Sequence, residues 1–176
     1  MVKKQRLLLS LKLFGIICGL WIVQGNLFGQ DEKFKALFIY NFTKYIEWPD
    51  ISGSEFKITV LGDANLVTEL EQIASKKAVG LNSIIVSSVK AGSEVKKCQI
   101  LFISHKNMGE LPKLIEKVKG SNMLIITEAP NGCSLGASMN FVTTNGSIKF
   151  EISKLNIDNA GLKVNEGLLK LGILVN

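Results

Sequence analysis

The sequence predicts a single layered α/β domain in which a mixed, mostly parallel sheet is flanked by helices. The strands predicted at 100–104 and 123–127 contain continuously apolar runs, 100–103 and 123–126, which are typical of parallel strands that are buried on both faces. Helical patterns alternate with such runs along the chain, which is the order of a layered α/β fold. The pair Asn145-Gly146 stands between two strand-like segments, 141–144 and 147–152, and predicts a C-terminal β-hairpin.

The first 29 residues predict a secretory signal peptide. Three basic side chains, Lys3, Lys4 and Arg6, precede an almost wholly apolar stretch at 7–23, and Gly29 supplies a small residue before a cleavage point. Cleavage there leaves residues 30–176 as one exported domain, which we expect in the periplasm.

An uncleaved membrane anchor is the alternative for this leader. Lys12 splits the apolar stretch, and residues 13–23 are short compared with the ~20 residues of a spanning helix. We therefore expect a mature protein that does not span the membrane.

The leader also carries much of the basic charge. The chain has 21 basic and 15 acidic residues, and four of the basic ones lie in the leader, which lowers the net charge from +6 to +2 on cleavage. Arg6 is the only arginine, and arginine makes the usual bidentate contacts with phosphate and guanine. The sequence therefore predicts no nucleic-acid partner.

A first helix is predicted at 31–47, with Pro49 ending it because proline disfavours helical backbone in the preceding residue. Apolar residues cover most of its girth, so we expect it to be buried on two sides, either deep in the fold or against a second subunit. The main stripe consists of Phe34, Leu37, Phe38, Asn41, Phe42 and Tyr45, and a second line consists of Ala36, Ile39 and Tyr40.

The remaining elements follow from the same patterns. Further strands are predicted at 56–61 and 83–88, and helices at 66–75 and 108–119. The hairpin is expected to form the antiparallel edge of the sheet, and two short C-terminal helices are expected after Ser153 and Asn165, which are both good N-caps.

Two cysteines remain after the leader, Cys98 and Cys133. If the runs at 100–104 and 123–127 are neighbouring parallel strands, the two residues lie at opposite ends of them, about 15 Å apart, whereas a disulfide needs Cα atoms within about 7 Å. We expect two separate buried thiols, and a disulfide between them is the alternative if the strands are arranged differently.

Several segments together resemble the YfiR family. Residues 35–49, KALFIYNFTKYIEWP, are similar to the opening helix of that family. Further matches follow in the same order and spacing, and the resemblance covers nearly all of residues 33–172. These matches are FKITVLGD at 56–63, CQILFIS at 98–104, MNF at 139–141, IKFEI at 148–152, GLKV at 161–164 and LLKL at 168–171.

The resemblance implies a regulatory role. The best understood members of the family are periplasmic repressors that bind the sensor domain of a membrane diguanylate cyclase, and others are associated with sensor kinases. It therefore implies a signalling adaptor whose partner is a diguanylate cyclase or a histidine kinase, and also implies a homodimer. Cys98 and Cys133 fall at or near cysteines of the family, but Thr59 stands where the partner of Cys98 is expected.

Four polar residues each follow the carboxyl end of a predicted strand, namely Asp63, His105, Lys106 and Glu128. Such ends share one edge of a parallel sheet, where ligands tend to bind. A periplasmic small-ligand-binding protein is therefore the alternative function, and a solvated loop edge is the simpler explanation of the same residues.

No catalytic residue, cofactor site or metal site is predicted. The glycine-rich segment 131–136 lacks the spacing and the lysine of a phosphate loop, and one histidine with two distant cysteines does not make a metal cluster. For partner binding the candidates are Trp48, Tyr40 and Tyr45, with Trp48 first because partly exposed tryptophans are enriched at binding hot spots.

Overall fold

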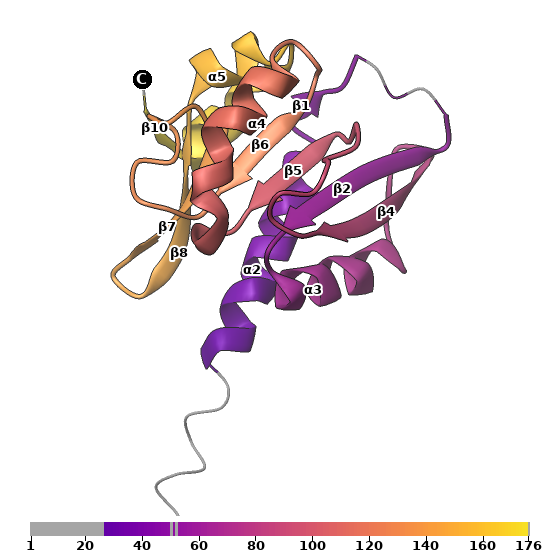
Figure 1. Ribbon diagram of the computed structural model, residues 1–176. Helices are drawn as coiled ribbons and strands as arrows, with labels where there is room; N and C mark the ends of the chain where they lie inside the picture. Colours follow the sequence, from indigo (N-terminus) through magenta and orange to yellow (C-terminus); the bar gives the residue numbers. More distant parts are fainter. Residues whose placement is uncertain (1–26, 50, 52, 176) are drawn as a thin grey trace, which may run out of the picture. The chain divides into compact units, whose positions relative to one another are not determined.

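The computed structural model describes residues 27–49, 51 and 53–175 (Figure 1). Most of the predicted signal segment, residues 1–26, lies outside the described residues. The chain divides into two compact units, Met1–Asp31 and Glu32–Asn176, and the sheets and both hydrophobic cores belong to the second. The elements are α2 (Leu27–Phe42), β1 (Ile46–Glu47), β2 (Glu55–Leu61), α3 (Ala64–Ala74), β3 (Ala78–Val79), β4 (Asn82–Val89), β5 (Ile100–Ile103), the 3-10 helix η2 (His105–Glu110), α4 (Leu111–Val118), β6 (Leu124–Thr127), β7 (Met139–Thr144), β8 (Ser147–Ile152), α5 (Lys154–Asn159), β9 (Lys163–Val164), α6 (Glu166–Leu171) and β10 (Ile173–Leu174).

Within the described part of the chain, the main sheet has eight strands in the order β10-β8-β7-β6-β5-β2-β4-β3. The pairs β7–β8 and β3–β4 are antiparallel and the other five are parallel. This arrangement confirms the predicted α/β fold with its mixed, mostly parallel sheet and its C-terminal hairpin and helices. The prediction that the hairpin forms the edge is wrong, because β10 pairs in parallel with β8 and lies outside it.

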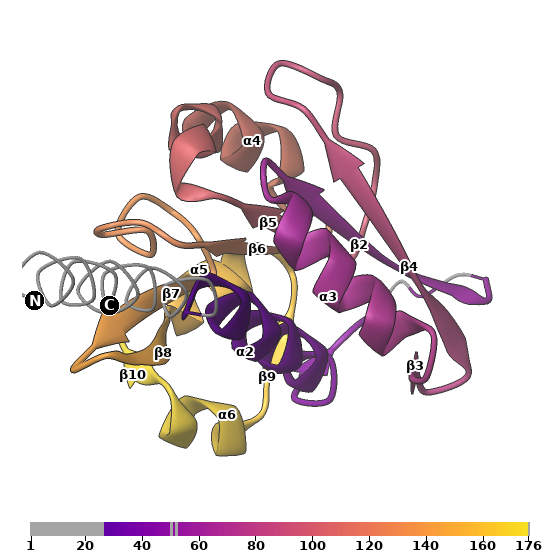
Figure 2. The same cartoon turned by 90° about the horizontal axis from the view of Figure 1, so that it is seen from below.

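Helices cover both faces of the sheet, as Figure 2 shows for α4 on one side and α2 and α3 on the other. Alternate strand residues point to opposite faces, so the central strands β2, β5 and β6 contribute to two cores. On one face, α2 and α3 pack against residues such as Phe102 and Ile126. On the other, α4 packs against Leu101, Ile103 and Ile125.

The helix α2 differs from its prediction in both its end and its buried face. It ends at Phe42 rather than Glu47, because residues 46–47 form β1 and pair with β9, more than a hundred positions away. Its buried face draws on both predicted lines, with Ala36 and Ile39 of the second line and Phe42 of the main stripe at most 1% exposed. Phe34 and Leu37, from the predicted main stripe, are 45% and 41% exposed.

Local capping and turn signals are confirmed. The hairpin turn has positive φ angles at Asn145 (52°) and Gly146 (72°), as a type I′ turn requires. The Ser153 hydroxyl accepts a hydrogen bond from the backbone N of Asn156 (3.3 Å), and Asn165 caps α6 in the same way. The helix predicted at 108–119 begins instead as η2 and becomes α-helical at Leu111.

Candidate functional site

The carboxyl ends of β2, β5 and β6 lie side by side, because these strands are parallel neighbours in the order β6-β5-β2. Asp63 follows β2, His105 follows β5 and Glu128 follows β6, so the sheet brings them to one edge as the sequence indicated. One carboxylate oxygen of Asp63 accepts a hydrogen bond from the backbone N of Leu66 (2.9 Å) and thereby caps α3.

Two residues of α2 join this edge. The Lys35 ammonium is 3.0 Å from a carboxylate oxygen of Glu32 and forms a second, very close ion pair with Glu128. Carboxylate oxygens of Glu32, Asp63 and Glu128 all lie within 4.8 Å of one another. We call these four residues the carboxylate cluster.

The carboxylate cluster is partly shielded from water. The side chains of Lys35, Glu32 and Glu128 are 12%, 14% and 19% exposed. Burial raises the pKa of Glu32, against the opposing effect of its hydrogen bond and charge attraction to Lys35. Burial alone would lower the pKa of Lys35, but its hydrogen bonds to Glu128 and Glu32 outweigh that effect and raise it. The lysine is therefore held in its charged form.

His105 and Lys106 contribute less than the sequence indicated. The backbone N of His105 donates to a carboxylate oxygen of Glu128 (3.3 Å), while the residue itself is exposed. Lys106 is exposed on η2. Sequence analysis missed Glu32 and Lys35, although both continue the line of buried positions Ile39 and Phe42 towards the start of α2.

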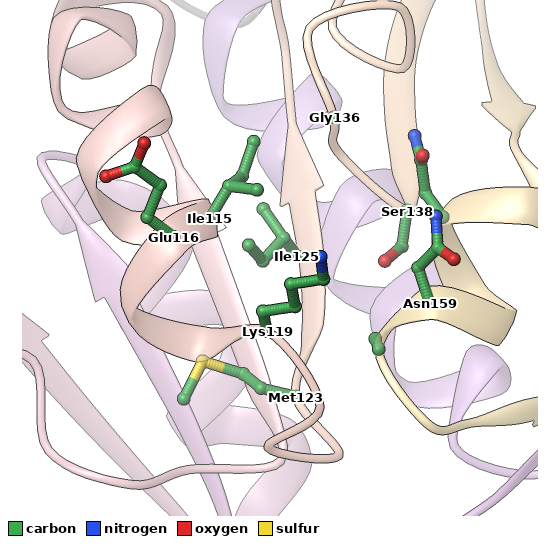
Figure 3. A pocket seen from close by; sticks show the side chains of 10 residues that line it. Ile115, Glu116, Lys119, Met123, Ile125, Gly136, Ser138 and Asn159 are labelled. Atoms are coloured by element: carbon green, nitrogen blue, oxygen red, sulfur yellow. The ribbon is translucent and has the colours of Figure 1, made fainter.

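A separate cavity of about 320 Å³ lies on the other face of the sheet, between α4, β6 and α5 (Figure 3). Its wall is mainly apolar, and the side chains of Lys119, Ser138 and Asn159 bring charged and polar atoms to it. The apolar side is formed by Ile115, Met123, Ile125, Gly136 and Ala160.

The loop before β7 is fixed beside this cavity by Asn156 of α5. Its side-chain amide donates to the backbone O of Cys133 and to that of Ala137, both at 2.8 Å. Gly136 has φ +108°, and a Cβ there would lie 2.4 Å from Cδ1 of Ile115. The hydrogen bonds tie the loop to α5, and the absence of a side chain at Gly136 lets it lie close to α4.

The three aromatic partner candidates are all half-buried. The Trp48 indole N donates to the backbone O of Thr43 (3.1 Å), and its ring packs edge-on against buried Phe56, with centroids 5.0 Å apart. Trp48 is thus tied to the core. Tyr40 lies beneath the Lys44 ammonium, 4.4 Å from the ring centre.

Tyr45 lies in a groove of about 480 Å³ between α2, the hairpin and the C-terminal segment. We call it the apolar groove, and its lining includes Phe38, Ile148, Phe150, Leu171 and Ile173. Two of these remain substantially exposed, Leu171 at 68% and Ile173 at 42%. Leu174 next to them is 56% exposed. Contiguous exposed apolar side chains of this kind mark interaction surfaces.

Cys98 and Cys133 are free thiols and both are buried. The sulfur of Cys98 is 3.9 Å from that of Met123. Burial raises the pKa of Cys98 to about 11, although hydrogen bonds with Thr59 oppose the shift. Burial also raises the pKa of Cys133 to about 12, with a further contribution from the charge of Glu151. Neither sulfur is activated as a nucleophile.

These features define a layered α/β domain with a half-buried carboxylate cluster, an apolar cavity and an exposed apolar groove. The chain belongs to the YfiR/HmsC-like family, whose model matches residues 32–173 and thus nearly all of the second unit. The family is a regulatory one. No curated protein matches the sequence. None of the helices within the described residues is long and apolar enough to cross a membrane.

Proposed function

We propose that this protein is a periplasmic signalling adaptor, which is exported by the leader at residues 1–29 and then released by its cleavage. It binds the extracytoplasmic domain of a membrane sensor, a diguanylate cyclase or a histidine kinase, and represses it. Membership of the YfiR/HmsC-like family supports this role, because the family comprises periplasmic repressors of diguanylate cyclases.

The observation that carries the proposal is the apolar groove with its exposed rim. Leu171 and Leu174 are more than half exposed beside a groove whose lining is largely aromatic and aliphatic. A contiguous patch of exposed apolar side chains is unusual on a protein that works alone, and its burial against a partner contributes about 25 cal/mol per Å². Tyr45 lines the same groove, so one of the aromatic candidates from the sequence belongs to this surface.

The test is a direct repression assay in cells. The full chain is produced together with the membrane diguanylate cyclase or histidine kinase encoded closest to its gene, and cyclic di-GMP or kinase autophosphorylation is measured. We expect the output to fall when the chain is present. Leu171→Glu places a charge on the groove rim and is expected to restore the output at least ten-fold.

Leu81→Glu is the matched control. Leu81 is fully exposed in the β3–β4 turn, at the opposite edge of the sheet from β10. The same substitution there is expected to leave repression unchanged. If Leu171→Glu represses as well as the unmodified chain, or if the chain changes the output of neither sensor type, the adaptor proposal is wrong.

The cavity between α4 and α5 supports a second candidate function, a small-ligand-binding protein. Its volume of about 320 Å³ is at the lower end of the ~300–1,000 Å³ range of ligand pockets, and its mixture of apolar wall and a few polar groups is typical of them. This location differs from the strand-end edge that the sequence indicated.

Thermal unfolding with a panel of small amphipathic metabolites tests the second function, because a ligand of the native state raises the melting temperature. Ala160→Phe fills the cavity and is expected to abolish any such shift. A shift that survives this substitution would place the ligand elsewhere.

A further inference from the structure

Two buried side-chain polar atoms stand out, because they alone among the described residues have no hydrogen-bond partner. They are Oε2 of Glu32 and Oγ of Ser104. Buried polar atoms are nearly always paired, since leaving one unpaired costs about 1–3 kcal/mol. Glu32 belongs to the carboxylate cluster, so the position of Ser104 decides whether the two atoms mark one site.

Ser104 is 3% exposed and directly follows β5, the strand between β2 and β6. Asp63 follows β2 and Glu128 follows β6, yet their carboxylates approach within 4.8 Å. Because neighbouring strands are about 4.8 Å apart, these two side chains must lean towards each other over the end of β5, where Ser104 lies.

The position of Ser104 directly after β5 also decides the face of the sheet to which its side chain points. Ile100 and Phe102, four and two positions earlier, face the core that contains α2, so the alternation of β5 directs Ser104 to the α2 side. A Cβ built on Gly62, next to Asp63, would lie 2.6 Å from the Ser104 hydroxyl. The hydroxyl therefore lies beside Gly62 and close to the side chain of Asn107, on the side of the strand ends that faces the start of α2.

The position in the fold is one where ligands collect. From β2 the chain passes through α3 to β4 on one side, and the next strand, β5, lies on the other side of β2. Helices α3 and α4 accordingly cover opposite faces of the sheet. The gap between the carboxyl ends of β2 and β5 is thus a topological switch point, the usual binding crevice of open α/β sheets.

The charges are unbalanced in a way that favours a cation. Three carboxylates face one ammonium group, that of Lys35. Two oxygens bound to one Ca²⁺ at about 2.4 Å are at most about 4.8 Å apart, and oxygens of the three carboxylates lie within that limit of one another. All the side-chain donors here are oxygens, which suits Ca²⁺ better than zinc or copper.

We propose that Glu32, Asp63, Glu128 and Ser104 form a binding site for a divalent cation, with Ca²⁺ as the best fit. Lys35 is the internal competitor for this site and moves aside when the cation binds. The proposal departs from the expectation of no metal that rested on histidine and cysteine alone. It stands independently of the adaptor function, since it concerns none of the groove residues.

The test is isothermal titration of the full-length chain with CaCl₂, and with MgCl₂ and ZnCl₂ for comparison. We expect one Ca²⁺ site, weaker binding of Mg²⁺, and loss of at least ten-fold in Ca²⁺ affinity in Glu128→Gln and in Glu32→Gln. Lys35→Met removes the competing ammonium group and keeps an aliphatic side chain of similar length, so this variant is expected to bind Ca²⁺ at least ten-fold more tightly.

Lys57→Met and Glu55→Gln are the matched controls, because Lys57 and Glu55 form an exposed ion pair elsewhere, at 3.2 Å. Both controls are expected to bind Ca²⁺ as the unmodified chain does. If the ion pairs of Lys35 serve only to stabilise the fold, Lys35→Met is expected to lower the stability without any gain in Ca²⁺ affinity. That result, or Ca²⁺ binding that is unaffected by Glu128→Gln, overturns the proposal.

Discussion

Replacing Phe42 by alanine tests the orientation of α2, on which the carboxylate cluster and the apolar groove both depend. Phe42 is 1% exposed, and its ring contacts those of Phe38, Phe141 and Phe150, with centroids 6.2, 6.1 and 4.9 Å away. Truncation of a buried phenylalanine typically costs about 3–5 kcal/mol. We place Phe42→Ala in the upper half of that range, since each aromatic pair adds about 0.5–1.5 kcal/mol to simple burial.

Phe34→Ala is the matched comparison on the same helix. Phe34 is 45% exposed, so about half of the ~1.5–3 kcal/mol available from burying such a side chain is lost, which gives about 1 kcal/mol. Urea unfolding followed by circular dichroism measures both free energies of unfolding. A cost for Phe34→Ala equal to or above that for Phe42→Ala would show that the Phe34 side of the helix faces the sheet, and would refute the orientation described here.

Three further outcomes follow from other parts of the molecule. Gly62→Ala is expected to lower the free energy of unfolding by several kcal/mol, because φ at this position is +87° and the added methyl would lie 2.6 Å from the Ser104 hydroxyl. A melting temperature within about 2 °C of that of the unmodified chain would contradict this expectation. Asn156→Leu leaves two loop carbonyls unpaired, so a loss of about 1–3 kcal/mol is expected in urea unfolding, and no loss would mean that the loop is held otherwise. Burial holds the pKa of Cys98 at about 11 and that of Cys133 at about 12 in the folded state, whereas the unfolded thiols ionise near pH 9. The free energy of unfolding is therefore expected to be unaffected by these thiols below pH 9 and to fall between pH 9 and 11. A free energy of unfolding that stays level from pH 8 to pH 10.5 would count against their burial.

The strands of the sheet centre were predictable because their signal is local. The run that became β5 is apolar throughout and that of β6 is apolar up to Thr127, as buried parallel strands are, and the Asn145-Gly146 turn requires two consecutive residues with positive φ. Each pattern reports on its own few residues, so no knowledge of the remaining chain was needed.

Features set by distant pairing were not predictable. The two-residue strands β1, β9 and β10 have no periodicity of their own, and they exist because residues far along the chain supply their hydrogen-bond partners. The end of α2 belongs to this class. Pro49 would end a helix before Trp48, but α2 already ends at Phe42 because residues 46–47 pair with β9.

Half of the candidate site was visible in the sequence. Asp63 and Glu128 follow strand ends and could be placed by topology alone. Glu32 and Lys35 could not, because charged residues in the first turns of a helix normally face solvent. Only the packing of α2 across the sheet turns them inwards, and apolar residues on both of its predicted lines left that rotation undetermined.

The pairing of β1 with β9 also bears on how the polypeptide is made. Ile46 is matched with Val164, so the first strand leaves the ribosome over a hundred residues ahead of its partner. At translation speeds of about 5–20 residues per second, the apolar side of α2 is without its aromatic neighbours on β7 and β8 for roughly 5–20 s. Until β7 and β8 have followed it, during synthesis or during export, the apolar side of α2 lacks its partners, and the domain can close only when its last quarter is present.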